Sequence, residues 1–490
     1  MKSDHIIQKV FVEITVNNKE KAYQIKDNIS SFLSADVFPE IEKYINSLEH
    51  TLAGRTLQIP HLEFNLDVKS SSLNTELKEK IAELFKEELS EIIRPLETLD
   101  HEGEKDAKAY LVGNQEKLVQ TFIYFLETGS MPWWNSEKKG IDFLEPTVFE
   151  MLLLTPSLQK SLISILPKQN VRDRIIYQLP DRQIAQLCRI ILENKEAEIN
   201  LESVIISRIS KMSSDKRIFI WQFVLNLLSE YLATSKNNLR EYLLQQVSTA
   251  SLAGLSTLKG NHKQWKTVVE IFPFITENEI LENIEKIHES IENIKNNAIP
   301  IHENSEKSVK KIIQDHPFAQ ENTVQNNGQY VQNTGLILIH PFMKTFFEHC
   351  DLWNAKNQEL IDPERCTHLL HYIATGKTNA AEYDMLFEKF LCNIPLNQTI
   401  NRHIKLSRKH KAQAKNVIES VQHNWAPMKK SSPALLQNEF FQRPGKLVTT
   451  DYDYTLTVER KTQDILLDKL GWGIGLVKLP WKEKFMLVNW

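Results

Sequence analysis

Residues 371–378, HYIATGKT, end in the Gly-Lys-Thr that closes a nucleotide-binding phosphate loop. That loop follows the pattern G-x-x-x-x-G-K-[ST] between a strand and a helix, so that backbone N–H groups surround the phosphates. His371 stands where the pattern has its first glycine. Leu369 and Ile373 are four residues apart, which is a helical spacing where the pattern needs a strand and a loop. We therefore expect no ATP binding at this stretch.

The same tripeptide is typical of a turn between two helices. Gly376 is predicted to end the first helix, because glycine readily takes the left-handed conformation found at helix C-termini. Asn379, with Glu382 three residues later, is predicted to be the N-cap of the next helix. His371 is then predicted to lie on a packed helix face.

Seven His and Cys side chains between residues 340 and 392 are of the types that bind zinc. Their spacing matches no zinc template, although His368 and His371 stand three apart and can share a helix face. We expect core histidines and buried free thiols instead, with no metal and no cofactor. The seven are His340, His349, Cys350, Cys366, His368, His371 and Cys392.

Two further stretches could bind phosphates or dinucleotides. Residues 402–415, RHIKLSRKHKAQAK, form the strongest basic cluster, but they contain no aromatic residue to stack on bases. Nucleic acid is therefore disfavoured, and a solvated helix face or a protein-contact patch is favoured. Residues 471–475, GWGIG, bring three glycines together, but no dinucleotide-binding helix follows, so a bend between strands is predicted.

Carboxylates are frequent near the end of the chain, at Asp451, Asp453, Asp464 and Asp468. None stands beside a nucleophile pattern or a glycine-rich turn, and spacing alone does not place two of them in one cleft. The chain contains neither G-x-S-x-G nor H-E-x-x-H. We therefore expect no enzymatic activity and no small-molecule substrate.

The composition is that of an ordinary globular protein. The 490 residues are 41% hydrophobic and 25% charged, and 59 Lys and Arg against 63 Asp and Glu give a net charge of −4. That charge attracts neither nucleic acid nor an anionic membrane to the chain as a whole. Four cysteines without a C-x-x-C pair suit a reducing compartment, and no apolar run reaches the 18 or so residues that span a membrane. We therefore expect a cytoplasmic protein.

Apolar periodicity predicts the elements that position these residues. Residues 5–16 and 59–68 alternate as strands do, with helical patterns at 19–49 and 74–95. Residues from about 105 to 295 are predicted to be stacked helical hairpins, and 335–442 compact helices. Residues 446–490 are strand-like. The prediction is a predominantly helical α+β chain.

Four parts follow from these patterns. They are an N-terminal α/β domain (1–100), a helical middle (101–295), a polar linker (296–333) rich in Asn, Gln and Glu, and a C-terminal helical domain that closes with short strands (334–490). At the end of the middle part, Ile280, Ile284, Ile287, Ile291, Ile294 and Ala298 alternate spacings of four and three. This seam favours one amphipathic helix on its own domain and leaves open a partner-binding coiled coil.

Longer stretches carry a resemblance to a known family. Five of them lie in the C-terminal half: GLILIHPFMKTFFEHCDL (335–352), RCTHLLHYIATGK (365–377), LFEKFLCNIPLNQTI (386–400), VIESVQHNWAPMKKSSPALLQNEFFQRPGKL (417–447) and DILLDKLGWGIGLVKLPWKEKFMLVNW (464–490). HIIQKVFVEI, IPHLEFNLDV and FLETGSMPWW (125–134) agree with it nearer the N-terminus. Together they resemble the contractile injection system tape measure protein family.

The resemblance implies which residues matter, as family-motif or interaction candidates. They are Gly335, His340, Pro341, Phe342, Leu369, His371, Tyr372, Gly376, Leu391, Cys392, Pro395, Trp425, Phe441, Arg443, Gly445, Trp472, Pro480, Trp481 and Trp490.

The family also implies a function. Its members belong to phage-tail-like contractile particles and are assigned to setting tube length. The resemblance implies a structural, non-enzymatic assembly protein that contacts tail tube, baseplate or cap proteins, acts in the cytoplasm during assembly and can be incorporated into the particle. No membrane contact is implied. An alternative is a globular adaptor or chaperone of the same particle that measures nothing.

Proline spacing bears on this choice. One continuous helix of the whole chain would span roughly 700 Å at about 1.5 Å per residue. Eighteen prolines prevent this, and the longest proline-free run, 181–272, would span at most about 140 Å. The sequence therefore predicts folded ends and leaves open whether the helical middle extends inside the particle.

Overall fold

The computed structural model describes thirteen segments of the chain. They are 5–7, 10–16, 18–48, 55–59, 61–66, 73, 75–98, 110–134, 142–192, 199–233, 239–252, 262–286 and 328–490. These segments form two compact units. The first comprises Met1–Phe122 and Pro132–Leu158, and the second comprises Ile123–Met131 and Gln159–Trp490.

The first unit is mainly helical. Its helical segments α1, η1, α2 and α3 bury Phe32, Val37, Ile41 and Phe85 in one small core. The Asn18 side chain accepts the backbone N–H of Glu20 and so caps α1. The elements are α1 (Lys19–Phe32), the π-helical η1 (Leu33–Val37), α2 (Phe38–Ser47), β1 (Thr56–Gln58), α3 (Thr75–Thr98), β2 (Tyr110–Val112), α5 (Pro146–Leu153) and α4 (Asn114–Thr128), whose residues from Ile123 onward belong to the second unit. The predicted helices at 19–49 and 74–95 are confirmed.

The two strands predicted for this unit are wrong over the described residues. Residues 5–7 and 10–16 form no strand, and neither do residues 61–66. Instead, the short β1 pairs antiparallel with β2, with Leu57 opposite Leu111. Alternating apolar residues indicate which side chains could share one face of a strand. A strand also needs a neighbouring strand for its backbone hydrogen bonds, and the alternation does not identify that neighbour.

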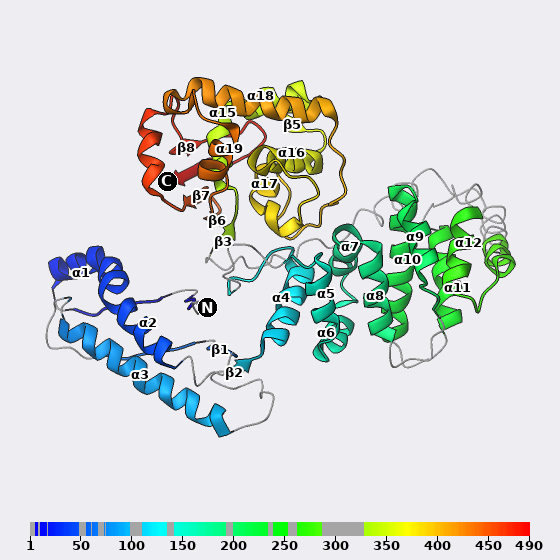
Figure 1. Cartoon of the computed structure of the whole chain (residues 1–490), viewed down its shortest axis with the longest axis horizontal. Helices are drawn as coiled ribbons and strands as arrows, with labels where there is room; N and C mark the ends of the chain where they lie inside the picture. Colours follow the sequence, from blue (N-terminus) through cyan, green and yellow to red (C-terminus); the bar gives the residue numbers. More distant parts are fainter. Residues whose placement is uncertain are drawn as a thin grey trace, which may run out of the picture. The chain divides into compact units, whose positions relative to one another are not determined.

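Stacked helices make up the middle of the second unit (Figure 1). Helix α10 packs against α7, α11 and α12, and α8 packs against α9. The helices are α6 (Ser157–Ile165), α7 (Gln169–Gln178), α8 (Asp181–Leu192), α9 (Ser203–Ser210), α10 (Ser214–Ala233), α11 (Leu239–Leu252) and α12 (His262–Ile271), with further helix at 277–286. The helical character predicted for the middle is confirmed over its described residues.

The C-terminal part of the same unit wraps helices around a five-stranded sheet. The strand order is β3-β6-β7-β9-β8; neighbours are antiparallel except β7 and β9, in which Leu456 lies opposite Val488. The strands are β3 (Gln329–Val331), β6 (Gly445–Thr449), β7 (Tyr454–Val458), β8 (Leu476–Val477) and β9 (Met486–Asn489), and β4 (Trp353–Asn354) pairs separately with β5 (Glu359–Leu360). The strand-like character predicted for 446–490 is confirmed.

Helices pack on this sheet. They are α15 (His340–His349), α16 (Pro363–Thr375), α17 (Leu386–Leu391), α18 (Arg408–Asn424) and α19 (Pro433–Leu436), together with the 3₁₀ turns η3 (Thr334–Ile339), η4 (Glu382–Met385), η5 (Ala426–Met428) and η7 (Thr462–Lys469) and the π-helical η6 (Gln437–Phe441). Their apolar faces form one large core with the strands. GWGIG (471–475) lies between η7 and β8, at bends, and not between two strands as predicted.

The turn after α16 is partly as predicted. Gly376 ends α16 in the left-handed conformation, with φ of 70°, which confirms the predicted C-cap. The N-cap prediction for Asn379 is wrong, because the next element is η4, which starts at Glu382 after Ala381. The backbone N–H of Glu382 donates instead to Oε1 of Gln178, on α7. A tertiary partner has therefore taken the place of a local cap.

Two predictions fall largely on residues that are not described. Of the heptad seam, Ile280 and Ile284 are described, and Ile280 is fully buried; Ile287, Ile291, Ile294 and Ala298 lie outside the described residues. Most of the predicted linker, 296–333, lies outside them too. Its last residues are structured, since β3 pairs with β6 and Tyr330 lies opposite Lys446. The four-part division of the chain stays a prediction.

Candidate functional site

A cluster of three charges lies fully buried in the second unit. Arg174 on α7, Glu382 on η4 and Lys389 on α17 have no exposed side-chain surface. Nε of Arg174 donates to Oε2 of Glu382 over 3.0 Å, and Nζ of Lys389 donates to Oε1 over 2.7 Å. We call these residues the buried charge cluster. One carboxylate between two cations leaves a net positive charge in the core, which backbone acceptors must stabilise.

Carbonyl oxygens supply those acceptors. Nη1 of Arg174 donates to the carbonyl of Leu126, and Nη2 donates to that of Asn397, over 2.6 and 2.7 Å. Lys389 donates to the carbonyls of Leu396 and Gln398. Burial lowers the pKa of Lys389, and the Glu382 carboxylate opposes that shift. The cluster thus joins segments near residues 126, 174, 385 and 397 through geometry that satisfies each charge.

Gly129 borders this cluster. Its φ is 79°, and a Cβ atom there would lie 2.3 Å from Oε1 of Glu382 and 2.9 Å from Nη2 of Arg174. Glycine is therefore required twice over, by the left-handed backbone and by the close approach of the ion pair. This residue is the glycine of FLETGSMPWW, so part of that motif has a packing explanation.

A second buried cluster surrounds His371. Nδ1 of His371 lies 2.9 Å from Oε1 of Glu388, and Nδ2 of Asn333 donates to the same oxygen over 2.8 Å. Asn333 has a φ of 58° and also donates to the carbonyl of Asp384. The cluster thus links the turn after β3 to α16 and α17. Oε2 of Glu388 is buried and has no hydrogen-bond partner among the described residues.

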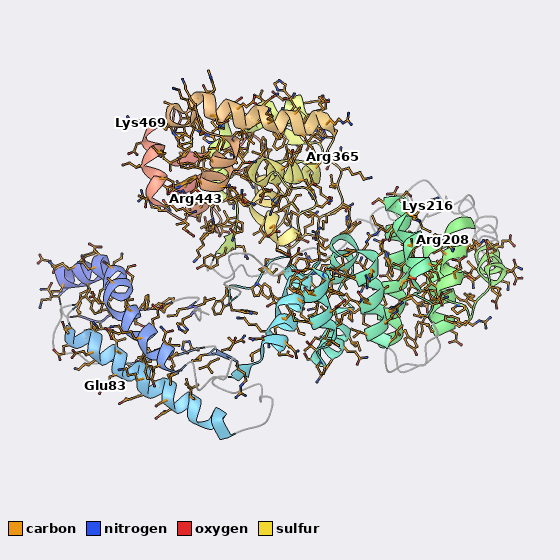
Figure 2. All side chains as sticks on the ribbon, viewed as in Figure 1. Glu83, Arg208, Lys216, Arg365, Arg443 and Lys469 are labelled. Carbon is orange, nitrogen blue, oxygen red and sulfur yellow. The ribbon has the colours of Figure 1, made fainter. Side chains whose placement is uncertain are left out.

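A third cluster forms around Arg443, which is fully buried inside the C-terminal fold (Figure 2). Its Nη2 donates to Oδ1 of Asp464 over 2.7 Å, and its Nη1 donates to the carbonyl of Glu459 over 3.0 Å. Oδ2 of Asp464 accepts Nε1–H of Trp490 over 3.1 Å. The guanidinium thereby connects the end of η6 to η7 and, through Asp464, to the last residue of the chain.

The other tryptophans among the candidate residues also donate to oxygen atoms of distant segments. Trp425 donates to the carbonyl of Leu466, Trp472 to that of Leu338 and Trp481 to that of Leu391, over 2.9, 3.0 and 2.7 Å. A buried indole needs such an acceptor, so each tryptophan combines a large apolar contact with one directional bond. These residues act as anchors of the C-terminal fold.

The remaining candidates divide into core residues and turns. Leu369, Leu391, Cys392 and Phe441 are fully buried, and Phe342 packs edge-on against Trp472. A Cβ on Gly335 would lie 1.7 Å from the carbonyl oxygen of Phe440, and one on Gly445 would lie 2.5 Å from that of Thr457. Exposed or half-buried candidates are His340, which begins α15, Pro341 next to it, Tyr372, Gly376, Pro395 and Pro480. A role of any candidate in partner contacts stays a prediction.

Three of the seven predicted zinc-type residues, Cys350, Cys366 and Cys392, lie in the large C-terminal core. All four cysteines are free and buried, and burial raises the pKa of Cys392 to about 12. Burial lowers the pKa of His368 to about 4, although its Nε2 lies 2.9 Å from the carbonyl of Asn401. Within the described segments, no group of three or more His, Cys, Asp and Glu side chains could hold a metal ion.

Residues that the sequence reasoning missed carry these clusters: Arg174, Glu382, Glu388, Lys389 and Asn333. One signal was available. LFEKFL (386–391) places a glutamate and a lysine inside an apolar run of a short helix, and such charges are buried only when they are paired. Glu388 meets Asn333 across 55 residues, and Glu382, the partner of Lys389, meets Arg174 across 208, and no local spacing indicates these contacts.

The fold and its buried clusters define a predominantly helical α+β protein in which the distinctive charged and aromatic residues hold segments together. A family model described as contractile injection system tape measure protein matches residues 4–490. The chain belongs to this family. No curated protein and no solved structure matches it. Across the described residues, no helix is both long enough and apolar enough to cross a membrane.

Proposed function

We propose that this chain is a non-enzymatic assembly protein of a contractile injection particle that takes part in setting tube length while it stays folded. In this proposal it contacts tail tube, baseplate or cap proteins during assembly in the cytoplasm. Family membership supports the particle and the link with tube length. The buried charge cluster supports the folded mode of action, and the proposal depends on it most.

Arg174 lies in the helical middle, and Glu382 and Lys389 lie in the C-terminal part. Pulling these segments apart would leave Arg174 without its carboxylate and Glu382 with Lys389 as its one cation in the cluster, and breaking a buried ion pair costs about 3–5 kcal/mol. Gln178 adds bonds to the carbonyl of Ile400 and from the N–H of Glu382. Stretching the helical middle along a tube would therefore require the second unit to unfold locally.

Helix lengths agree with this reading. The longest helix described in the second unit, α10, has 20 residues and spans about 30 Å. Its neighbours are shorter and end at loops, so the middle is a stack of short helices. A chain that measured length by extension would need continuous structure over the distance it measured.

The extended ruler is the second candidate, and the family description favours it. In that mode tube length follows the number of residues between the two folded ends. Insertions separate the two candidates. Helical segments of about 20 and about 40 residues, placed in turn after residue 256 and after residue 310, would add about 30 and 60 Å to an extended chain.

Electron microscopy of purified particles then measures tube length. The folded mode predicts an unchanged, narrow distribution for all four insertions, while growth in proportion to the insert would overturn it and support the ruler. Quantifying the protein in the particles tests its place in assembly. A fixed low copy number identifies a structural part, and absence identifies a transient assembly factor.

A further inference from the structure

Five basic side chains follow one another on the outer side of the C-terminal fold. They are Lys405, Arg408, Lys409, Lys411 and Lys415, here called the basic strip; four are exposed and Lys411 is half-buried. They lie in the loop before α18 and in its first two turns. Residues 401–450 contain ten Lys and Arg but only two Asp and Glu, in a chain whose net charge is −4. The strip is therefore a local excess of positive charge.

Part of the strip lies at the N-terminus of α18, where positive charge is unfavourable for a helix. The first turn of α18 has no acidic residue, and it begins with Arg408 and Lys409. Aligned peptide dipoles leave partial positive charge at a helix N-terminus, so cations there are destabilising. The N-cap, Ser407, is neutral and accepts the backbone N–H of His410. The helix thus keeps charges that its own stability does not require.

Neutralisation within the chain is incomplete. Lys409 pairs with Asp351, and Lys415 lies 3.5 Å from Glu419, in pairs whose side chains are more than half exposed. Lys411 lies over the ring of Tyr372 at 5.5 Å. Lys405 and Arg408 form no ion pair with another described residue. Exposed pairs are weak, so most of the positive potential reaches solvent.

Helix α18, which carries four of the five residues of the strip, is packed against the core of the C-terminal fold. Ala414, Val417, Ile418 and Val421 are buried on the inner face of α18, which packs against α15, α16 and α19 (Figure 1). Arg408, Lys411 and Lys415 are spaced by three and four, so they share one flank of the helix. Carboxylates on a partner can therefore meet these three cations without prior rearrangement of the backbone.

The chemistry of the strip selects among anionic partners. Its five residues include no aromatic side chain, and Lys411 lies over the neighbouring Tyr372 ring, so stacking on single-stranded bases is disfavoured. The apolar face of α18 is used in the core, so no apolar face remains to enter a lipid interface. Asp351 and Glu419 lie among the cations, and they would repel a continuous row of phosphates. Protein surfaces carry mixed charges and tolerate such neighbours.

We propose that the basic strip is a docking surface for an acidic protein surface. The proposal does not depend on whether the chain measures tube length. Its test uses the purified full-length chain and a labelled helical peptide of about 20 residues with glutamate at every fourth position. Fluorescence anisotropy measures the affinity, and carbodiimide coupling of Lys to Glu, mapped by mass spectrometry, locates the contact.

The test variant combines Lys405→Gln, Arg408→Gln and Lys415→Gln, and it keeps Lys409 and Lys411 with their internal partners. The control combines Lys211→Gln, Lys266→Gln and Lys430→Gln, which removes the same charge from other exposed positions. Removing three weak pairs should reduce peptide affinity about tenfold, and the control should reduce it less than about twofold. Circular dichroism checks that both variants fold; Arg408→Gln alone replaces the test variant if it does not.

Three results would overturn the proposal. Equal losses in the two variants would show that only net charge matters. Peptide links that map outside Lys405, Lys409, Lys411 and Lys415 would place the contact elsewhere. Tighter binding of a DNA duplex or of phosphatidylserine vesicles than of the peptide, at the same physiological salt, would assign the strip to nucleic acid or to membrane.

Discussion

Arg174 and Glu382 stand 208 residues apart in the sequence, and their side chains meet at 3.0 Å with no exposed surface on either. Lys389 also donates to Glu382, and four backbone carbonyls accept the remaining hydrogen bonds of Arg174 and Lys389. The ion pair therefore couples the stability of the helical middle to that of the C-terminal part. Removing it should destabilise both parts.

Replacing Glu382 should strongly destabilise the protein, because it leaves two buried cations without a counter-charge. Glu382→Gln is expected to lower the free energy of unfolding by about 3–5 kcal/mol. Urea denaturation followed by circular dichroism measures this. Glu348→Gln is the matched control: it removes the acid of an exposed pair with Lys344 and should cost less than about 1 kcal/mol.

Replacing the whole cluster by apolar residues should cost less than removing the carboxylate alone. The variant Arg174→Met, Glu382→Leu and Lys389→Met leaves no unpaired charge, and such exchanges are often neutral or stabilising. We expect it to be more stable than Glu382→Gln by about 2 kcal/mol or more. A triple variant less stable than the single one would show that the cluster contributes more than charge balance.

Two glycines with similar backbone angles should respond differently to alanine. Gly129 and Gly376 have φ of 79° and 70°, but a Cβ on Gly376 would meet no atom of the described residues within 4 Å. Gly376→Ala should cost about 1 kcal/mol of left-handed strain. Gly129→Ala adds a clash with Glu382 and should cost about 3 kcal/mol or more. Thermal denaturation compares them, and equal losses would contradict the packing role of Gly129.

The stability of the protein should fall at mildly acidic pH because of His368. Its folded pKa of about 4 lies below the usual value of 6.5. Between these values the unfolded chain binds a proton that the folded chain does not, so stability is present above pH 6.5 and is lost as pH falls toward 4. The loss attributable to this residue should be about 2–3 kcal/mol.

His368→Gln should flatten the pH dependence over that window, because glutamine does not titrate. Urea denaturation at intervals between pH 4 and 7 supplies the measurement. His423→Gln, at an exposed position of α18, should leave the curve unchanged. Parallel curves for wild type and His368→Gln would contradict the assignment.

The thiols should be inert in the folded protein. All four are buried, and burial raises the pKa of Cys188 and Cys392 to about 12 and that of Cys350 to about 11. Thiolate is the reacting form, so labelling with Ellman's reagent at pH 8 should be at least about 1000-fold slower than in urea. A rapid reaction of one thiol without denaturant would reveal an exposed site.

Local patterns predicted much of this fold. Apolar periodicity located the helices of both units. A helix that buries one face needs apolar residues three and four positions apart, and this spacing is visible in the sequence whatever the helix packs against. The strands at 446–490 followed from alternation and short turns. Residues 5–16 show the limit of the same reasoning, since alternation alone does not provide the partner strand that a ladder requires.

The buried clusters could not be read from spacing. Glu382 was interpreted as a capping residue of a local turn, and in the structure its carboxylate bonds a guanidinium from α7. His371 was placed correctly on a packed face, but its bond to Glu388 depends on how α16 meets α17. In both cases tertiary packing decides which hydrogen-bond partner the side chain meets, and the local sequence does not distinguish between the possible partners.

The order of the sheet sets a condition on biosynthesis. Strand β9 is made after β3, β6, β7 and β8, yet it lies between β7 and β8 and bonds to both. The ribosome must therefore release Met486–Asn489 before the sheet can close, so the helical middle has time to form first. A chain cut short by premature termination would lack an interior strand and expose the edges of β7 and β8, and such unpaired edges favour aggregation.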